Sequence, residues 1–173
     1  FSSDKMGLII FSSEAFIQCP LTYDLSALNL FIETLSTELV PNSGTDFAPP
    51  LELALSKFQL DQENPTQQKS KIIVLISDGE DFGDESTDVA KELESFGIKV
   101  FTLGVGTEEG ARIPEGNGFK RDDQGNIVVT ELNPEALKRI ASLTNGEYFE
   151  LSETNNEISS LINTINGIEG ELQ

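Results

Sequence analysis

The feature that most constrains the fold is the run KIIVLIS at residues 71–77, which is apolar at five of seven positions. A nearly unbroken apolar run is typical of a parallel strand covered on both faces. Residues 86–97 predict a helix that ends at Gly97, and residues 99–106, KVFTLGVG, predict a second buried strand. Strand, helix and strand in this order form a βαβ unit, whose crossover is almost always right-handed. This stretch therefore predicts an α/β fold with a parallel sheet.

The N-terminal part predicts an antiparallel hairpin followed by two helices. The hairpin strands are MGLIIFSS and AFIQCPLT, with a short join between them. The first helix, residues 24–39, has apolar residues at helical spacing and Asp24 as its N-cap. The second, residues 47–58, confines two prolines to its first turn, where their missing N–H groups cost little.

The C-terminal part predicts a small hairpin, a helix, a strand and a closing helix. Residues 116–132 form the hairpin, with DDQGN as its turn, and residues 133–146 form a helix with Asn133 as N-cap. Residues 147–152 predict a strand, and the closing helix at 154–165 opens with Thr154 and Glu157 in capping-box spacing. We therefore expect one domain over residues 1–173: a doubly wound, mostly parallel sheet with helices on both faces, an antiparallel edge hairpin and a hairpin insertion at about 107–132.

Composition excludes several classes of function. The 173 residues carry 11 Lys and Arg against 30 Asp and Glu, a formal charge of −19, which disfavours nucleic acid and anionic lipid as partners. The chain has no histidine, so Ser-His-Asp and Cys-His catalysis and most zinc sites are excluded. Cys19 is the single cysteine; it lies in an apolar stretch and is interpreted as a core residue.

Six carboxylates follow the first apolar run, within VLISDGEDFGDESTD: Asp78, Glu80, Asp81, Asp84, Glu85 and Asp88. They do not form an EF-hand, because the fifth and twelfth positions counted from Asp78 are Phe82 and Val89. The glycines of LGVGTEEG also miss the G-x-G-x-x-G spacing of a nucleotide site. A catalytic pair such as Asp78 and Glu80 remains an alternative.

A magnesium site is the third interpretation of this region. Ligands of open α/β sheets bind beyond the carboxyl ends of the strands, where Asp78 is expected. Thr45 offers a hydroxyl in the loop SGTD before a helix, and hydroxyl and carboxylate oxygens are ligands that Mg²⁺ prefers. The competing interpretations are a helix N-cap for Thr45 and a turn former for Asp78.

These stretches together resemble a von Willebrand factor type A domain, and within that class the BatA/BatB aerotolerance family. The resemblance rests on GLIIFSSEAFIQCPLTYD, SGTDFAPPLELAL, KIIVLISDGED, GIKVFTLGVGTEEGARIPEG and DDQGNIVVTELNPEALKRIA, which cover nearly the whole chain in order. It implies a metal-ion-dependent adhesion site in which Thr45 matches the second loop and Asp78 the third. The first loop, D-x-S-x-S, has no match in these residues, so we expect an N-terminally incomplete domain with a partial site.

The resemblance also implies a function and a location. It implies a non-enzymatic protein-binding module in which Mg²⁺, or Mn²⁺ or Ca²⁺, of the intact domain accepts a carboxylate from a partner protein. It implies a bacterial inner-membrane protein of a stress complex, with this domain in the periplasm and the membrane segments outside the chain. A gap in the sheet would favour association of copies. The alternatives are a metal-independent interaction domain and a hydrolase that uses Asp78 with Glu80 or Asp81.

The acids that follow Asp78 are not expected to be the main metal ligands. Glu80 and Asp81 are expected at the rim of the metal site. The remaining three, Asp84, Glu85 and Asp88, are interpreted as a solvated entry to the next helix, where negative charge suits the helix dipole.

Overall fold

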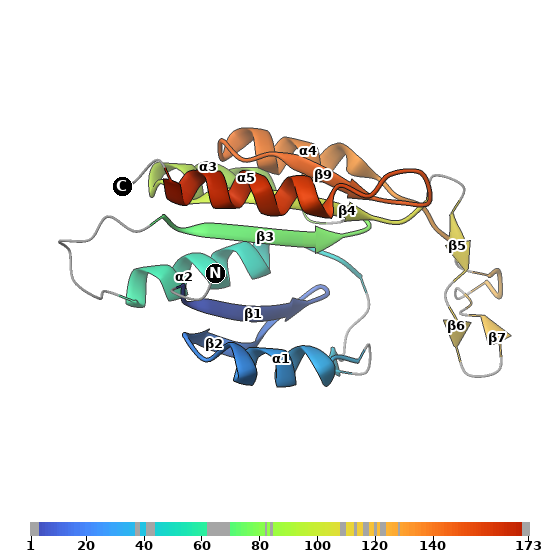
Figure 1. The fold of residues 1–173 in the computed structure, drawn as a ribbon. Coiled ribbons are helices and arrows are strands. Elements are labelled where there is room, and N and C mark those ends of the chain that lie inside the picture. The colour runs from blue at the N-terminus through green and yellow to red at the C-terminus, as the bar shows by residue number, and fades with distance from the viewer. Residues whose placement is uncertain are drawn as a thin grey trace. The chain divides into compact units, whose positions relative to one another are not determined.

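The computed structural model of the chain, drawn in Figure 1, falls into two compact units, and one of the three points at which the chain passes between them lies inside the acidic run. Unit 1 comprises Phe1–Thr66 and Asp81–Leu93, and unit 2 comprises Gln67–Glu80 and Glu94–Gln173. The structure describes residues 4–36, 39–40, 44–61, 70–81, 83, 85–107, 110–112, 114–115, 118–119, 121, 124–127 and 129–170.

Unit 1 is built on the predicted antiparallel hairpin of β1 (Met6–Phe11) and β2 (Ala15–Thr22), in which Phe11 pairs with Ala15. Two helices, α1 (Leu25–Glu33) and α2 (Ala48–Leu60), both contact this hairpin. The ring of Phe11 meets the ring of Phe47 edge to face, with centroids 6.0 Å apart. A further helix, α3 (Ser86–Ser95), begins in this unit. The hairpin and the two helix positions confirm the prediction for this region.

Helix α1 is shorter than predicted, because it ends at Glu33 rather than near residue 39. Asp24 caps its start as expected, since its Oδ1 accepts the N–H groups of Ser26 and Ala27 at 3.0 Å each. At the other end, the Thr34 hydroxyl donates to the Phe31 carbonyl at 2.9 Å. A side chain that bonds to the main chain in this way competes with continuation of the helix, which is the local reason for the early end.

Unit 2 contains a three-stranded parallel sheet in the order β3 (Ile72–Ser77), β4 (Lys99–Val105), β9 (Tyr148–Leu151). Helix α4 (Pro134–Leu143) contacts β4 and β9, and α5 (Ile158–Gly170) contacts β9 (Figure 1). The two helices cover opposite faces, because alternate residues of β4 face each of them. The parallel sheet with helices on both faces confirms the predicted α/β class.

The alternation along β4 identifies these faces. Phe101 and Leu103 form a buried cluster with Leu161 of α5. Between them, Thr102 points to the other face and donates its hydroxyl hydrogen to the Leu137 carbonyl of α4 at 3.1 Å. The buried side chains on the α4 face include Leu137 and Ile140, both fully buried.

Strand β3 departs from the prediction that it is covered on both faces. Val74 and Ile76 are 41% and 56% exposed. They pair with Phe101 and Leu103 in the parallel register and so share the α5 face of the sheet. Helix α5 contacts β9 at the far side of β4, and within the described ranges β3 pairs with β4 alone. The apolar run predicted the strand correctly but not the coverage of this face.

The segment between β4 and α4 contains two short antiparallel ladders instead of one simple hairpin. β5 (Ala111–Arg112) pairs with β8 (Val129–Thr130), and β6 (Pro114–Glu115) pairs with β7 (Gly118–Phe119). Arg121 and Ile127, which flank the predicted turn, form an isolated antiparallel β-bridge. Asp122 and Asp123 of that turn lie outside the described residues.

The closing helix begins later than predicted, at Ile158. The capping box of Thr154 with Glu157 is wrong, because the Glu157 carboxylate accepts the N–H of Glu150 at 2.8 Å. Glu157 therefore ties the start of α5 back to strand β9. Glu157 directly precedes the helix and its carbonyl accepts the N–H of Leu161 at 2.9 Å, while the Oδ1 of Asn156 accepts the N–H of Ile158 at 3.4 Å.

Candidate functional site

Asp78 directly follows β3, at the carboxyl end of the strand and inside unit 2. Its Oδ1 accepts from the Ser77 hydroxyl at 3.3 Å and from the Glu80 N–H at 3.4 Å. Both distances lie beyond the usual range for hydrogen bonds of these types, so both bonds are weak. No donor on a described residue contacts Oδ2. The half-buried carboxylate therefore keeps most of its capacity to bind a cation.

The main chain around Asp78 is held much more tightly than its carboxylate. The carbonyl of Asp78 accepts the N–H of Asn133, the N-cap of α4, at 2.9 Å. Gly79 has φ +90° and is buried, and a Cβ at this position would collide with the Asn133 carbonyl oxygen. Sequence inspection did not identify Asn133 as part of this region, because 55 positions separate it from Asp78.

Glu80 is the second acid at this edge of unit 2. Its partial burial raises the pKa of its carboxyl group, and the negative charge of Asp78 raises it further. Two neighbouring carboxylates of like charge disfavour simultaneous ionisation. A cation at this position would relieve that repulsion.

Asp81, three positions after Asp78, has a different environment inside unit 1. Its Oδ1 accepts the N–H groups of Phe47 and Gly83, each at 3.3 Å, and its Oδ2 accepts the Ser86 hydroxyl at 2.7 Å. Phe47 precedes α2, and Ser86 is the first residue of α3. Asp81 therefore links the starts of two helices. Asp81 thus has a structural role within unit 1, and its place at the rim of a metal site stays a prediction.

Thr45 lies in unit 1 just before α2 and is half-buried. Thr45 is not the N-cap of α2, since that position is taken by Phe47. The side chain that bonds to the first turn is Asp46, whose Oδ1 accepts the Ala48 N–H at 2.9 Å. The N–H of Asp46 in turn donates to the Ser12 carbonyl at 3.0 Å. No hydrogen bond joins the Thr45 hydroxyl to another described residue, so no described residue competes with a metal for this oxygen.

One more oxygen near this loop lacks a partner. The Ser12 hydroxyl is buried and makes no hydrogen bond to any residue that the structure describes. A buried polar group without a partner is destabilising by about 1–3 kcal/mol, so such a position favours a bound water or ion.

The donor atoms in the two units fit a hard cation. Thr45 contributes a hydroxyl in unit 1 and Asp78 a carboxylate in unit 2, and oxygens of both kinds are ligands of Mg²⁺. Within the described ranges no three His, Cys, Asp or Glu side chains gather as a ready metal cluster. A cation at either residue therefore needs waters or a partner's oxygens to complete its shell.

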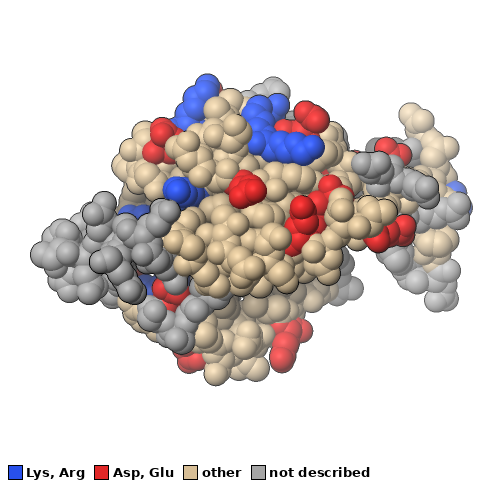
Figure 2. All heavy atoms as spheres, turned by 45° about the horizontal axis from the view of Figure 1, so that its top comes forward, with Lys and Arg blue, Asp and Glu red and all other residues tan. Residues whose placement is uncertain are grey.

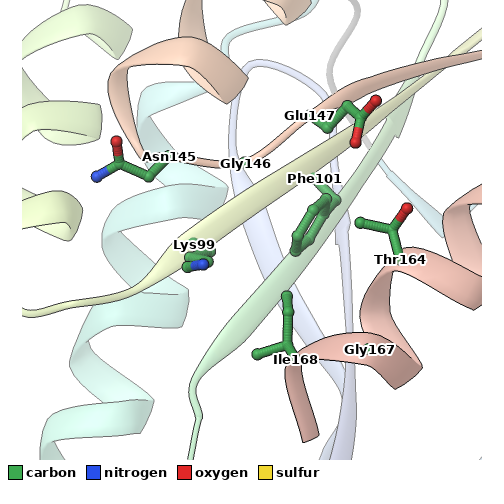
Figure 3. Close-up of a pocket in the computed structure, with 8 residues that line it drawn as sticks. All are labelled: Lys99, Phe101, Asn145, Gly146, Glu147, Thr164, Gly167 and Ile168. Carbon is green, nitrogen blue, oxygen red and sulfur yellow. The ribbon is translucent and has the colours of Figure 1, made fainter. Parts of the chain in front are cut away.

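A pocket of about 300 Å³ lies at the opposite end of the unit 2 sheet (Figure 3). Its lining includes Phe101, Lys99 and Glu147 from the strand side, and Thr164 and Ile168 from α5. Because Lys99 pairs with Ile72 while Ser77 pairs with Gly104, the pocket and Asp78 are separated by nearly the full strand, ~17 Å. The pocket is thus not part of the Asp78 site.

The remaining acids behave as surface groups. Figure 2 shows Asp and Glu side chains spread over one face of the protein, some of them beside Lys and Arg side chains. Asp88 is largely exposed and pairs with Lys91 at 3.0 Å within the first turns of α3. Asp84 lies outside the described residues, and Glu85 is exposed.

Comparison with known families and structures agrees with this fold. The von Willebrand factor type A domain matches residues 1–164, and the chain belongs to this family. Such domains generally mediate protein–protein interactions, and the chain is an interaction module of this type. No curated protein matches the chain in sequence.

Two solved structures confirm the narrower resemblance to the BatA/BatB aerotolerance family. The chain is 33% identical to the conserved hypothetical protein BatB from Bacteroides thetaiotaomicron, with a TM-score of 0.83, covering 96% of this chain and 78% of that one. It is 35% identical to an aerotolerance-related membrane protein from Bacteroides fragilis, also with a TM-score of 0.83, covering 95% and 80%.

A more distant structural neighbour shares the fold of this chain. A mussel byssus protein, proximal thread matrix protein 1 with a zinc-occupied MIDAS motif, is 16% identical with a TM-score of 0.60, covering 93% of this chain and 33% of that one. This likeness shows the shared fold alone. In the part of the chain that the structure describes, no helix is both long and apolar enough to cross a membrane.

Proposed function

We propose that the chain is a non-enzymatic, cation-dependent protein-binding domain, with Thr45 and Asp78 as ligands of Mg²⁺, Mn²⁺ or Ca²⁺. The observation that carries the proposal is the contrast among side-chain oxygens. Asp46 and Asp81 each accept a short hydrogen bond, at 2.9 Å from the Ala48 N–H and at 2.7 Å from the Ser86 hydroxyl. The Asp78 carboxylate has only two long hydrogen bonds, and the Thr45 hydroxyl has none to a described residue.

The remaining coordination positions follow from the chemistry of the cation. D-x-S-x-S does not occur in these 173 residues, so Thr45 and Asp78 supply a minority of the ligands. Mg²⁺ usually keeps several waters and binds one or two carboxylates. In the proposal one water is replaced by a carboxylate of the partner protein, so partner binding depends on the cation.

The cellular setting is part of the same proposal. Relatives at 33–35% identity are BatB and an aerotolerance-related membrane protein. We therefore place the domain in a bacterial inner-membrane protein of a stress-related complex, with the domain on the periplasmic side. Protease accessibility of the tagged protein in spheroplasts tests this placement, and protection of the domain from external protease would contradict it.

A hydrolase that uses Asp78 with Glu80 or Asp81 is the less favoured function. Asp81 already accepts three hydrogen bonds, from the Ser86 hydroxyl and from the N–H groups of Phe47 and Gly83, so it is poorly placed to transfer protons. Turnover of a panel of phosphoesters, lost in Asp78→Ala, would support the hydrolase and contradict the binding function.

Thermal unfolding with Mg²⁺, Mn²⁺ and Ca²⁺ tests the proposed ligands. We expect a cation to raise the Tm of the wild-type protein and a smaller rise in Thr45→Val. Thr34→Val is the matched control, because Thr34 is an exposed threonine whose hydroxyl bonds to the Phe31 carbonyl, and its variant should keep the full rise. An equal rise of the Tm in Thr45→Val and in the wild type would show that Thr45 is not a ligand. No rise of the Tm with any of the three cations would support a metal-independent interaction domain.

Association of copies through an unpaired sheet edge is a separate prediction. Within the described ranges β3 pairs on one side, and its exposed Val74 and Ile76 add apolar surface. Unpaired edges favour pairing with another chain. Light scattering should show a mass above that of the monomer at high concentration, and a constant monomer mass would contradict this prediction.

A further inference from the structure

The turn that carries Asp78 is attached to α4 by a main-chain contact, here called the Asp78 clasp and formed by Asp78, Gly79 and Asn133. The Asn133 N–H donates to the Asp78 carbonyl at 2.9 Å, a short hydrogen bond between residues far apart in sequence. Gly79 packs so closely on Asn133 that a Cβ would collide with its carbonyl group and come within 3.3 Å of Leu137. The turn therefore has little room to shift relative to α4.

Asn133 is itself fixed to the helix. Its Oδ1 accepts the N–H of Glu135 at 3.3 Å, and Pro134 restricts the backbone of the residue before it. The clasp thus joins the Asp78 turn to the first turn of α4 and not to a free loop.

Helix α4 is bonded to the central strand of unit 2 at two further levels. The hydroxyl of Thr102 donates to the Leu137 carbonyl at 3.1 Å, and the hydroxyl of Thr144 accepts the N–H of Val100 at 3.1 Å. Both threonines are at most 1% exposed. Because buried, satisfied hydrogen bonds of this kind rigidify a core, α4 is a fixed support for the clasp.

We propose that the Asp78 clasp preorganises Asp78 for a cation, with Gly79 and Asn133 as positioning residues. This inference rests on the proposed function. The main chain of Asp78 is held from one side by β3 and from the other by α4, while its carboxylate stays free of short hydrogen bonds. Groups that orient a metal ligand typically change metal affinity by about 10–100-fold. Loss of the clasp should therefore weaken cation binding without removing any ligand atom.

Two glycine variants test the clasp with matched backbone strain. Gly79→Ala and Gly97→Ala each place a Cβ on a residue of positive φ, +90° and +69°, but a Cβ at Gly97 meets nothing within 4 Å. In calorimetric titrations with Mn²⁺, we expect Gly79→Ala to raise the Kd by about 10-fold or more. Gly97→Ala should leave the Kd close to the wild-type value.

A second capping variant separates positioning from stability. Asp24→Ala removes the side-chain cap of α1 in unit 1, where Asp24 accepts the N–H groups of Ser26 and Ala27, and leaves the clasp untouched. It should lower the Tm and leave the Kd for Mn²⁺ nearly unchanged. A Kd that rises in step with the loss of Tm in all three variants would indicate a structural role alone and overturn the inference.

If Gly79→Ala does not fold, hydrogen exchange of the main-chain amides in the wild-type protein tests the clasp instead. Mn²⁺ should slow exchange of the Asn133 amide, and Asp78→Asn should abolish that slowing. Unchanged exchange at Asn133 in a protein that binds Mn²⁺, or a folded Gly79→Ala variant with wild-type affinity, overturns the clasp but leaves the proposed function standing. A wild-type protein that shows no Mn²⁺ binding overturns both.

Discussion

Asp78 and Asp81 are three positions apart in one acidic run, yet their surroundings differ in almost every respect. Asp81 lies in unit 1 and accepts three hydrogen bonds at the starts of α2 and α3. Asp78 lies in unit 2, where its main chain is clamped and its carboxylate makes only two long hydrogen bonds. The comparison shows that the number of acids in a run says little about a site. The deciding factor is which carboxylates already accept a short hydrogen bond, as Asp81 does from the Ser86 hydroxyl at 2.7 Å.

The largest effect on stability is expected for Asp81→Ala. The change leaves the Phe47 N–H and the buried Ser86 hydroxyl without their acceptor, and unsatisfied buried donors cost about 2 kcal/mol of unfolding free energy. Chemical denaturation measures the loss. Asp88→Ala is the control, because its exposed ion pair with Lys91 contributes about 0.5 kcal/mol or less. Equal unfolding free energies of Asp81→Ala and Asp88→Ala would contradict a structural role for Asp81.

Ser86→Ala should have an intermediate effect. It removes the shortest hydrogen bond of Asp81, 2.7 Å, but leaves two main-chain donors in place. We expect a loss of about 1 kcal/mol in the same denaturation experiment. A variant as stable as the wild type would mean that Asp81 is held by Phe47 and Gly83 alone.

Asp78→Asn should change the stability of the cation-free protein by less than about 0.5 kcal/mol, because only long, weak hydrogen bonds involve its carboxylate. Denaturation in the presence of a chelator is the relevant measurement. A loss as large as that of Asp81→Ala would make Asp78 a structural residue as well and break the comparison.

The smallest effect concerns the pH dependence contributed by Glu80. Its folded-state pKa is raised above 4.5 by partial burial and by Asp78, so folding favours the protonated carboxyl. The stability it contributes is fully present below pH 4.5 and is lost as the pH rises through the higher folded-state pKa. We expect the Tm of Glu80→Gln minus the Tm of the wild type, both measured in the presence of a chelator, to increase as the pH is raised from acid to neutral. A difference that does not change with pH would contradict the assigned shift.

Much of the fold could be predicted because local patterns determine it. The apolar runs of β3 and β4 and the Asn133-Pro134 start of α4 predict their elements directly. The end of α1 and the start of α5 could not be predicted, because side-chain bonds of Thr34 and Glu157 decide them against the helical period.

The candidate site was predictable only in part, for a related reason. Asp78 and Thr45 follow from their places after a strand and before a helix. The roles of Asp81 and Asn133 depend on contacts with Phe47, 34 positions away, and with Asp78, 55 positions away. No local motif signals contacts of this range. They become visible only when the chain is folded.

The most direct test of the contrast is a calorimetric titration with Mn²⁺ of the wild type, Asp78→Asn and Asp81→Asn under identical conditions. The account predicts that the wild type binds Mn²⁺, that Asp78→Asn loses the binding heat while keeping wild-type stability, and that Asp81→Asn keeps the binding heat while unfolding more easily. Binding that survives in Asp78→Asn and disappears in a folded Asp81→Asn would contradict it.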